Sequence, residues 1–264
     1  MASVGGLSVY SDYSRGTRRH SYASTFFPTV IEKVYGYVRP STAMVNSGII
    51  AFVATIFFVI SFTSPYWLQS YAYTYSDFNN MGLWEFCFNG FRYPKYQFDY
   101  KFTGCNYIFS EEYRIIWSWM LPAWLMTVQT FMTIALLASM TTLVTVSLVL
   151  VRWPLQFVMR YEWHLTGFAF CCQAATTVCI FFAVLVFGVM CWSRHWLLNP
   201  NFNYLSWSYA FAVVAGGIHA FAGLTLLHET YEARERKRQV SNLMHMEPQG
   251  QMGMNMGMMG QGYI

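Results

Sequence analysis

Charged side chains are scarce in this chain of 264 residues. Asp, Glu, Lys and Arg together make up 11% of it, whereas soluble domains contain about 25%. Four long apolar stretches, at residues 44–62, 124–151, 166–191 and 207–228, contain none of these residue types. Each approaches or exceeds the ~20 apolar residues that a helix needs to cross a bilayer. The sequence therefore predicts an all-α membrane bundle of four transmembrane helices.

Clustered ionisable residues, which enzymes, transporters and metal sites require, are also missing. Three histidines lie at the ends of apolar stretches without an Asp or Glu at motif spacing: His164, His195 and His228. Intramembrane enzymes and transporters instead place paired acids or broken helices at membrane depth. We therefore predict that the chain is not an enzyme, has no catalytic residue, and binds neither a cofactor nor a metal.

Basic residues are distributed unequally between the segments that alternate with the apolar stretches. The segments predicted to be cytoplasmic contain eleven Lys and Arg residues, and the two outer loops, 63–123 and 192–206, contain five. Because cytoplasmic loops carry an excess of Lys and Arg, both tails, 1–43 and 229–264, are predicted to be cytoplasmic. Residues 1–40 lack the apolar core of a signal peptide. The net charge of +4 follows from this asymmetry, so no nucleic-acid partner is expected.

A proline marks the expected start of the second span. Residues 115–151 are apolar for 37 residues, and one helix of that length would extend about 55 Å, against a bilayer core of ~30 Å. Proline is tolerated in the first turn of a helix. We therefore predict that the helix begins near Pro122, with a kink inside a longer helix as the alternative.

The first outer loop has the patterns of a small β-sheet. Residues 71–75 and 96–102 alternate aromatic residues with others, which is typical of half-buried strands. Asn89-Gly90 lies between two aromatic segments and predicts a hairpin turn. We expect a small extracellular antiparallel sheet on the outer ends of the helices. Residues 192–206 can add one edge strand to it.

Two of the six cysteines, Cys87 and Cys105, lie in this first outer loop. Disulfides persist in the oxidising exterior of the cell. A bridge across this interval would stabilise the fold by roughly 3 kcal/mol on the chain-entropy estimate. We predict a structural disulfide, with two free thiols as the alternative.

The order of residues in this loop resembles the first extracellular segment of the claudin superfamily. The matching residues are Trp67, Gly82, Leu83, Trp84, Cys87 and Cys105. The resemblance covers residues 44–228 and implies a claudin-like fold, in which the tryptophan and the Gly-Leu-Trp turn anchor the sheet at the bilayer surface. The interval between the cysteines is longer than in vertebrate claudins, and Arg114 matches their conserved arginine poorly. With the long N-terminal tail, the chain most resembles insect septate-junction proteins of the Pasiflora type.

Small side chains recur every four residues along the third and fourth spans. They are Gly167, Cys171, Ala175, Cys179 and Ala183, followed by Ala212, Gly216 and Ala220. Such ridges let helices approach closely, either within one bundle or between subunits. Cys171 and Cys172 are predicted to be packing residues, with palmitoylation as the alternative. We expect Gln129, Gln173 and His219 to form hydrogen bonds between helices, with a proton relay at His219 as the alternative.

The predicted cytoplasmic tails contain three further signals. The fourth helix is expected to continue to Arg238, with Glu232 and Arg236 paired at its surface. A basic cluster, residues 234–238, is expected to contact anionic membrane lipid. The chain ends in Tyr263-Ile264, and an apolar residue with a free carboxylate can bind the groove of a PDZ scaffold domain. A plain disordered end is the alternative.

Together these observations indicate a structural protein that acts by assembly. We expect a component of an occluding, septate-type cell–cell junction at the lateral plasma membrane. It would contribute to the paracellular barrier by assembling laterally and across the junction, with itself and with other junction membrane proteins. The alternative is an auxiliary or trafficking subunit of a membrane channel or receptor, since the claudin superfamily includes such proteins.

Overall fold

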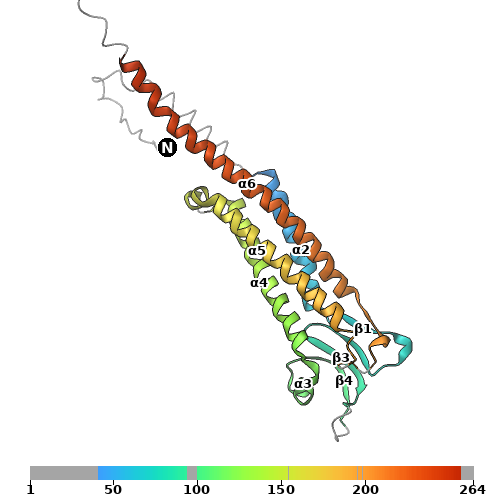
Figure 1. The fold of residues 1–264 in the computed structure, drawn as a ribbon. Helices are drawn as coiled ribbons and strands as arrows, with labels where there is room; N and C mark the ends of the chain where they lie inside the picture. The colour runs from blue at the N-terminus through green and yellow to red at the C-terminus, as the bar shows by residue number, and fades with distance from the viewer. Residues whose placement is uncertain (1–40, 94–99, 154, 195, 198, 257–264) are drawn as a thin grey trace, which may run out of the picture. The chain divides into compact units, whose positions relative to one another are not determined.

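A bundle of four long helices dominates the computed structural model, which describes residues 41–93, 100–153, 155–194, 196–197 and 199–256. The helices are α2 (Thr42–Thr63), α4 (Ala123–Val151), α5 (Leu155–Met190) and α6 (Trp207–Met256). Each contains a segment long and apolar enough to cross a membrane. Helix α4 packs against α5, α5 against α6, and α2 against both α4 and α6 (Figure 1). The predicted four-helix membrane bundle is confirmed.

Local sequence explains where α2 and α4 begin. The hydroxyl of Ser41 accepts a hydrogen bond from the backbone N–H of Ala43 at 3.2 Å and so caps α2. Pro122 occupies the N-cap of α4, which confirms the predicted start. Residues before it form a 3-10 helix, η2 (Glu111–Ile116), and a short helix, α3 (Trp117–Met120). Pro122 therefore separates two helices and does not kink a single one.

Helices α5 and α6 extend beyond the predicted spans. Helix α5 begins at Leu155 rather than at residue 166, and α6 continues from the end of its span at residue 228 to Met256. The predicted spans stopped where charged residues appear. The predicted continuation of the fourth helix to Arg238 is confirmed, and α6 runs further. One ion pair, between Glu162 and Arg236, joins the extended parts of α5 and α6. The terminal residues Tyr263 and Ile264 and the tail up to residue 40 lie outside the described residues.

Five short strands form one antiparallel sheet at the end of the bundle where α2 ends and α4 begins (Figure 1). The sheet has the order β4-β3-β2-β1-β5. Its strands are β1 (Leu68–Ser70), β2 (Phe78–Met81), β3 (Glu85–Phe91), β4 (Phe102–Tyr107) and β5 (Asn203–Leu205). Strand β5 comes from the second outer loop and pairs with β1. The predicted small sheet and its added edge strand are confirmed.

The strand predicted at residues 71–75 is wrong. This segment contains a 3-10 helix, η1 (Ala72–Thr74), and the hydroxyl of Thr74 donates to the carbonyl of Tyr71 at 2.6 Å. Tyr71 and Tyr73 stack on one another with ring centroids 5.2 Å apart, and both are exposed. Alternation predicts a strand only where one face is buried, and neither face is buried here.

The hairpin turn predicted at Asn89-Gly90 is also wrong. Strand β3 continues through both residues to Phe91, which pairs with Phe102 of β4. The pairing register shifts between Asn89 and Phe91, and Gly90 adopts a φ of 76°. This combination is a β-bulge with glycine in the left-handed region. The predicted strand at 96–102 lies partly outside the described residues; β4 begins at Phe102.

Adjacent glycines in α6 provide a test of the bundle packing. A Cβ at Gly216 would lie 3.1 Å from the Ile180 side chain of α5, whereas a Cβ at Gly217 would meet nothing within 4 Å. We expect Gly216→Val to overpack this contact and to lower the free energy of unfolding by about 1–3 kcal/mol. Gly217→Val is the control, because it changes helix propensity equally. Thermal unfolding of the detergent-purified variants measures the difference; equal melting temperatures would contradict this packing.

Candidate functional site

Trp67 joins the sheet to the helix bundle. Its side chain is fully buried, and its indole N–H donates to the carbonyl of Ser61 near the end of α2 at 2.8 Å. The ring contacts Phe187 of α5 and Tyr209 of α6 at centroid distances of 4.9 and 5.8 Å. Its backbone N–H donates to Met81 of β2 at 2.8 Å, and its carbonyl accepts from Ser206 at 3.0 Å. One residue thus fixes the sheet to three helices.

The Gly-Leu-Trp segment forms a tight turn against the end of α2. A Cβ at Gly82 would lie 2.4 Å from the carbonyl oxygen of Ser64 and 2.6 Å from the Cα of Pro65, so no side chain fits there. Leu83 is fully buried. Its carbonyl accepts a hydrogen bond from the Gln129 side chain of α4 at 2.7 Å. Gln129 therefore connects α4 to this turn, and the predicted hydrogen bond between helices is wrong for Gln129.

The burial of these residues corrects the role that the family resemblance implied. Trp67 and Leu83 are inaccessible, so they contact protein and not the surface of the bilayer. Trp84 is half-buried, and its ring lies 5.3 Å from that of Phe62 in α2. The segment anchors the sheet to the helices directly. The distance of the Gly-Leu-Trp segment from the bilayer is therefore set by its contacts with the helices.

A disulfide joins Cys87 and Cys105, as predicted. These residues lie opposite one another in strands β3 and β4. Next to the bridge, the side-chain amide of Asn80 donates to the carbonyl of Pro65 at 2.7 Å and contacts the Cys87 sulfur at 3.4 Å. The bridge thereby fixes the outer strand pair and closes the segment between the two strands.

Aromatic side chains fill the space beneath β3 and β4. Phe88 and Phe91 stack at 4.8 Å, and Phe91 stacks on Trp119 of α3 at 5.2 Å. Tyr113 is buried beside them, and its hydroxyl donates to the carbonyl of Phe86 at 3.0 Å. Burial, together with the neighbouring Glu112 carboxylate, raises the pKa of Tyr113 to about 12. The phenol therefore stays neutral and keeps this hydrogen bond at any physiological pH.

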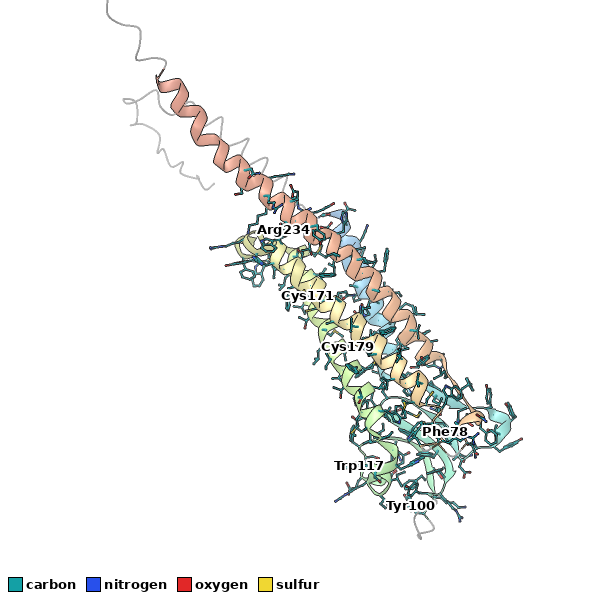
Figure 2. All side chains as sticks on the ribbon, viewed as in Figure 1. Phe78, Tyr100, Trp117, Cys171, Cys179 and Arg234 are labelled. Carbon is teal, nitrogen blue, oxygen red and sulfur yellow. A yellow bond between two sulfur atoms is a disulfide. The ribbon has the colours of Figure 1, made fainter. Side chains whose placement is uncertain are left out.

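Exposed aromatic residues lie at both edges of the sheet. Near the β5 edge, Tyr73 and Tyr75 are 74% and 93% exposed. Near the β4 edge, Tyr107 and Phe109 pack on each other at 5.4 Å, and about half of each is exposed. Figure 2 shows side chains projecting around the sheet, with Tyr100 labelled at its far end. Large aromatic side chains in contact with water are typical of protein–protein interfaces.

The ridge of small residues predicted on α5 does not coincide with the buried face of that helix. Ala183 is fully buried, but Cys171 and Ala175 are exposed, and Gly167 and Cys179 are half-buried. A spacing of four residues advances by about 40° per step around a helix of 3.6 residues per turn, so the ridge turns away from the bundle. Figure 2 labels Cys171 and Cys179 along this helix. The exposed part of the ridge is available for contacts with lipid or with another subunit.

The buried face of α5 follows a spacing of three and four residues instead. It consists of Thr166, Ala169, Gln173, Thr176, Ile180, Ala183 and Phe187. On α6, Ala212 is buried, Gly216 contacts Ile180, and Ala220 is half-buried. The side-chain amide of Gln173 donates to Nδ1 of the buried His219 at 2.7 Å. The predicted hydrogen bond between helices is confirmed for this pair.

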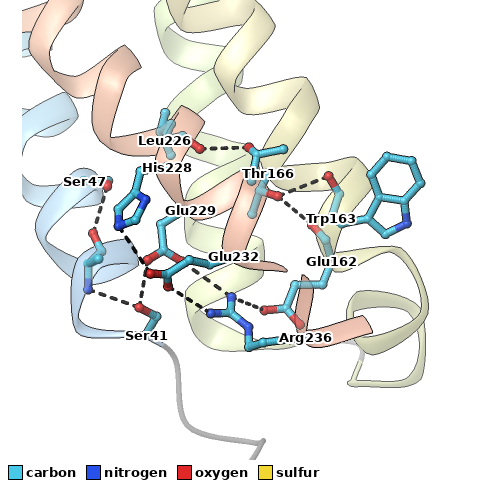
Figure 3. Close-up of polar contacts among 12 residues, drawn as sticks. Ser41, Ser47, Glu162, Trp163, Thr166, Leu226, His228, Glu229, Glu232 and Arg236 are labelled. Atoms are coloured by element: carbon cyan, nitrogen blue, oxygen red, sulfur yellow. Dashed lines mark hydrogen bonds and ion pairs between the residues drawn. The ribbon is translucent and has the colours of Figure 1, made fainter. Parts of the chain in front are cut away.

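A charged cluster joins three helices at the end of the bundle opposite the sheet (Figure 3). Arg236 of α6 lies within 3.4–3.6 Å of three carboxylates: Glu162 of α5, and Glu229 and Glu232 of α6. Glu229 is 1% exposed and also accepts a hydrogen bond from Ser41 at 2.8 Å. Buried carboxylates need such partners. The Arg236 guanidinium therefore offsets part of the negative charge of these carboxylates, and the cluster links α2, α5 and α6.

The sequence prediction found only one contact of this cluster. It identified Glu232 and Arg236 as a surface pair, and that contact is confirmed at 3.4 Å. It missed Glu162 and Glu229, and it assigned Arg236 to lipid. Glu229 lies four residues before Ala233, which is buried, and seven before Arg236. This spacing places the three on one helix face, a signal that could have indicated an inward-facing carboxylate.

No group of three or more His, Cys, Asp or Glu residues within the described part of the chain is arranged to hold a metal ion. Cys171 is exposed and Cys172 is half-buried. Their assignment as packing or palmitoylated residues stays a prediction.

Replacement of Gly82 tests the docking of the turn. Gly82→Ala places a methyl group 2.4 Å from the carbonyl oxygen of Ser64, so the turn must move, and we expect a loss of about 1–3 kcal/mol of stability. The control is Gly223→Ala, where the added methyl would lie 3.6 Å from Gln173, an ordinary contact. Surface biotinylation of cells that express each variant measures the outcome. Equal surface levels of both variants would show that the turn tolerates a side chain.

Loss of the disulfide should reduce folding yield. Cys87→Ser removes the link across 18 residues of sequence, which is worth roughly 3 kcal/mol on the chain-entropy estimate. We expect retention of the variant inside the cell, and the same effect for Cys105→Ser. The double variant should be no worse than either single one, because both remove the same bond. Cys171→Ser is the control, and normal surface delivery of Cys87→Ser would contradict the structural role of the bridge.

Comparison with known proteins identifies the family. The sequence matches the family described as "PMP-22/EMP/MP20/Claudin tight junction" over residues 52–228. This range contains just over half of α2, all five strands, α4, α5 and the first part of α6, up to residue 228. No curated protein matches the chain significantly. The match, the four helices and the disulfide-closed sheet agree: the chain belongs to the PMP-22/EMP/MP20/claudin family of multi-pass membrane proteins.

Proposed function

We propose that this protein is a structural component of an occluding cell–cell junction, of the septate type, and that it seals the space between neighbouring cells by assembly. Sheets of neighbouring molecules in one membrane contact each other through their edges, and the exposed aromatic residues meet the opposing membrane. The description of the matched family names claudins and the tight junction, which supports this proposal.

The observation that carries the proposal is a rigid sheet with exposed aromatic residues at both edges. Among the strands of the described residues, β4 and β5 are the outermost, and each is paired on one side alone. A free strand edge offers backbone N–H and C=O groups to another chain. The docking of Trp67 and the Cys87–Cys105 bridge hold these edges in a fixed position on the bundle. A surface that is ordered before contact loses less entropy on assembly.

The orientation follows from the excess of Lys and Arg. In the proposed arrangement the sheet is extracellular, and both tails are cytoplasmic. Arg234, Lys237 and Arg238 are exposed on the part of α6 beyond its apolar segment. There they can attract anionic lipid of the inner leaflet. The terminal Tyr263-Ile264 would recruit a cytoplasmic PDZ scaffold.

Depletion in a polarised epithelium tests the function. We expect the protein at lateral cell contacts, and we expect its loss to let a small fluorescent dextran cross the layer. Re-expression of the wild-type protein should restore the barrier. Intact exclusion of dextran, with the protein located elsewhere, would reject the barrier role and favour an auxiliary or trafficking subunit of a channel or receptor.

Variants at the exposed tyrosines separate assembly from folding. Tyr73→Ser with Tyr75→Ser removes two aromatic side chains that are largely in water, so we expect normal surface levels but no rescue of the dextran barrier. Tyr231→Ser is the control, because Tyr231 is also exposed, at 63%, but lies on α6 beyond the apolar segment. Full rescue by the double variant would exclude these tyrosines from the sealing contact.

A further inference from the structure

A hollow of about 280 Å³ lies between the segment that follows β1 and the second outer loop. The first segment contributes Tyr75 and Asp77 to its lining, and the loop contributes Asn199 and Phe202. The two segments are tied together, because the backbone N–H of Tyr71 donates to the carbonyl of Phe202 at 2.9 Å. The volume is just below that of drug-sized ligand sites, about 300–1,000 Å³. It suits one residue of a longer ligand.

We propose that this hollow and the tyrosines around it bind a neutral glycan, an uncharged chain of sugar residues. Such a glycan would be what the aromatic residues near the β5 edge meet on the opposing membrane, so the proposal rests on the proposed function. The faces of a sugar ring carry C–H groups, which pack against the flat, electron-rich faces of aromatic rings. The hydroxyls of a sugar both donate and accept hydrogen bonds, and so do amide side chains.

The composition of the two segments favours a neutral glycan over a protein partner. Residues 66–81 and 199–206, all of which the structure describes, contain one charged residue, Asp77. Their exposed residues are four aromatic residues, three asparagines, one aspartate and one alanine. Protein interfaces are enriched in Arg and Met as well as in aromatic residues, and neither type is exposed in these two segments. Since the segments contain no Lys or Arg, they offer no counter-charge to a sulfated or sialylated glycan.

Three tyrosines form a row next to the hollow. Tyr73 stacks on Tyr71 with ring centroids 5.2 Å apart, and the ring of Tyr71 lies 4.8 Å from that of Tyr204 in β5. Tyr73 is 74% exposed, so much of its ring is open to a ligand. Rings that already pack on one another present their faces in fixed positions. Less conformational entropy is therefore lost when a ligand binds.

Tyr75 adopts a costly backbone conformation at the hollow. Its φ is 48°, in the left-handed region, which bulky residues rarely adopt. The ring is 93% exposed, so burial of the side chain does not explain this conformation. Backbone strain of this kind clusters at ligand sites. The side chains of Asp77 and Asn199 line the same hollow, where they can form hydrogen bonds with the hydroxyls of a sugar that packs on Tyr75.

The test is an array of immobilised glycans overlaid with fluorescent proteoliposomes that contain the whole chain. The array carries neutral glycans that end in glucose, galactose, mannose or N-acetylglucosamine, and acidic glycans that carry sulfate or sialic acid. We expect saturable binding to at least one neutral glycan, which empty liposomes do not show. Binding to none of them, or a preference for the acidic glycans, would overturn the proposal. Glycan binding on the array, together with an intact dextran barrier after depletion, would reject the proposed function alone.

Two variants and a matched control locate the contact. Tyr75→Asn removes the ring, and asparagine tolerates the left-handed region, so we expect an intact fold and binding that is about ten-fold weaker. Asp77→Lys adds a positive charge and should move the preference toward sulfated glycans. Tyr107→Asn is the control, because Tyr107 is exposed near the β4 edge and does not line the hollow. Wild-type binding by both Tyr75→Asn and Asp77→Lys, or an equal loss in Tyr107→Asn, would reject this site.

Discussion

The contact between Trp67 and the end of α2 is the interaction on which the rest of the structure depends. The sheet is too small to be stable alone, because isolated short strands are marginal in water. Trp67 gives it a buried anchor: its indole N–H bonds to Ser61, and its ring packs between Phe187 and Tyr209. Ser61 and Ser208 add reciprocal hydrogen bonds from their hydroxyls to each other's carbonyls. The helices thus supply the core that the sheet lacks.

Opposite ends of the bundle are fixed by different kinds of contact. At the sheet end, aromatic packing and backbone hydrogen bonds position the strands. At the other end, Arg236 holds the carboxylates of Glu162 and Glu229. Between them, the contacts are small and neutral, such as the 2.7 Å hydrogen bond between Thr55 and Ser139. This distribution agrees with the low polarity of the bilayer core, where an unpaired charge is costly.

The sequence predicted the helices, the disulfide and the existence of the sheet, because lipid and an oxidising exterior impose strong rules on composition. It failed where contacts between distant parts of the chain determine the local conformation or the burial of a residue. The Asn89-Gly90 pair favours a turn locally. Strand β3 nevertheless continues through it, because Phe91 is buried and packs against Trp119. The role of Gly82 depends on the approach of Ser64 and Pro65, and no local pattern encodes that approach. Likewise, the inward position of Glu229 depends on Arg236 and on Ser41, which is 188 residues away.

A sheet that is docked in this way can act as a unit. Because Trp67, Leu83 and Cys87 are buried or bridged, the sheet cannot rotate on the helices without breaking the contacts of α2, α4, α5 and α6 together. A contact made at one edge of the sheet therefore constrains the orientation of the bundle that carries it, and of the opposite edge. Rows of such molecules would share one alignment set by their edges. For the assembly that we propose, rigid docking of the sheet matters more than any single exposed residue, because it gives neighbouring molecules one alignment.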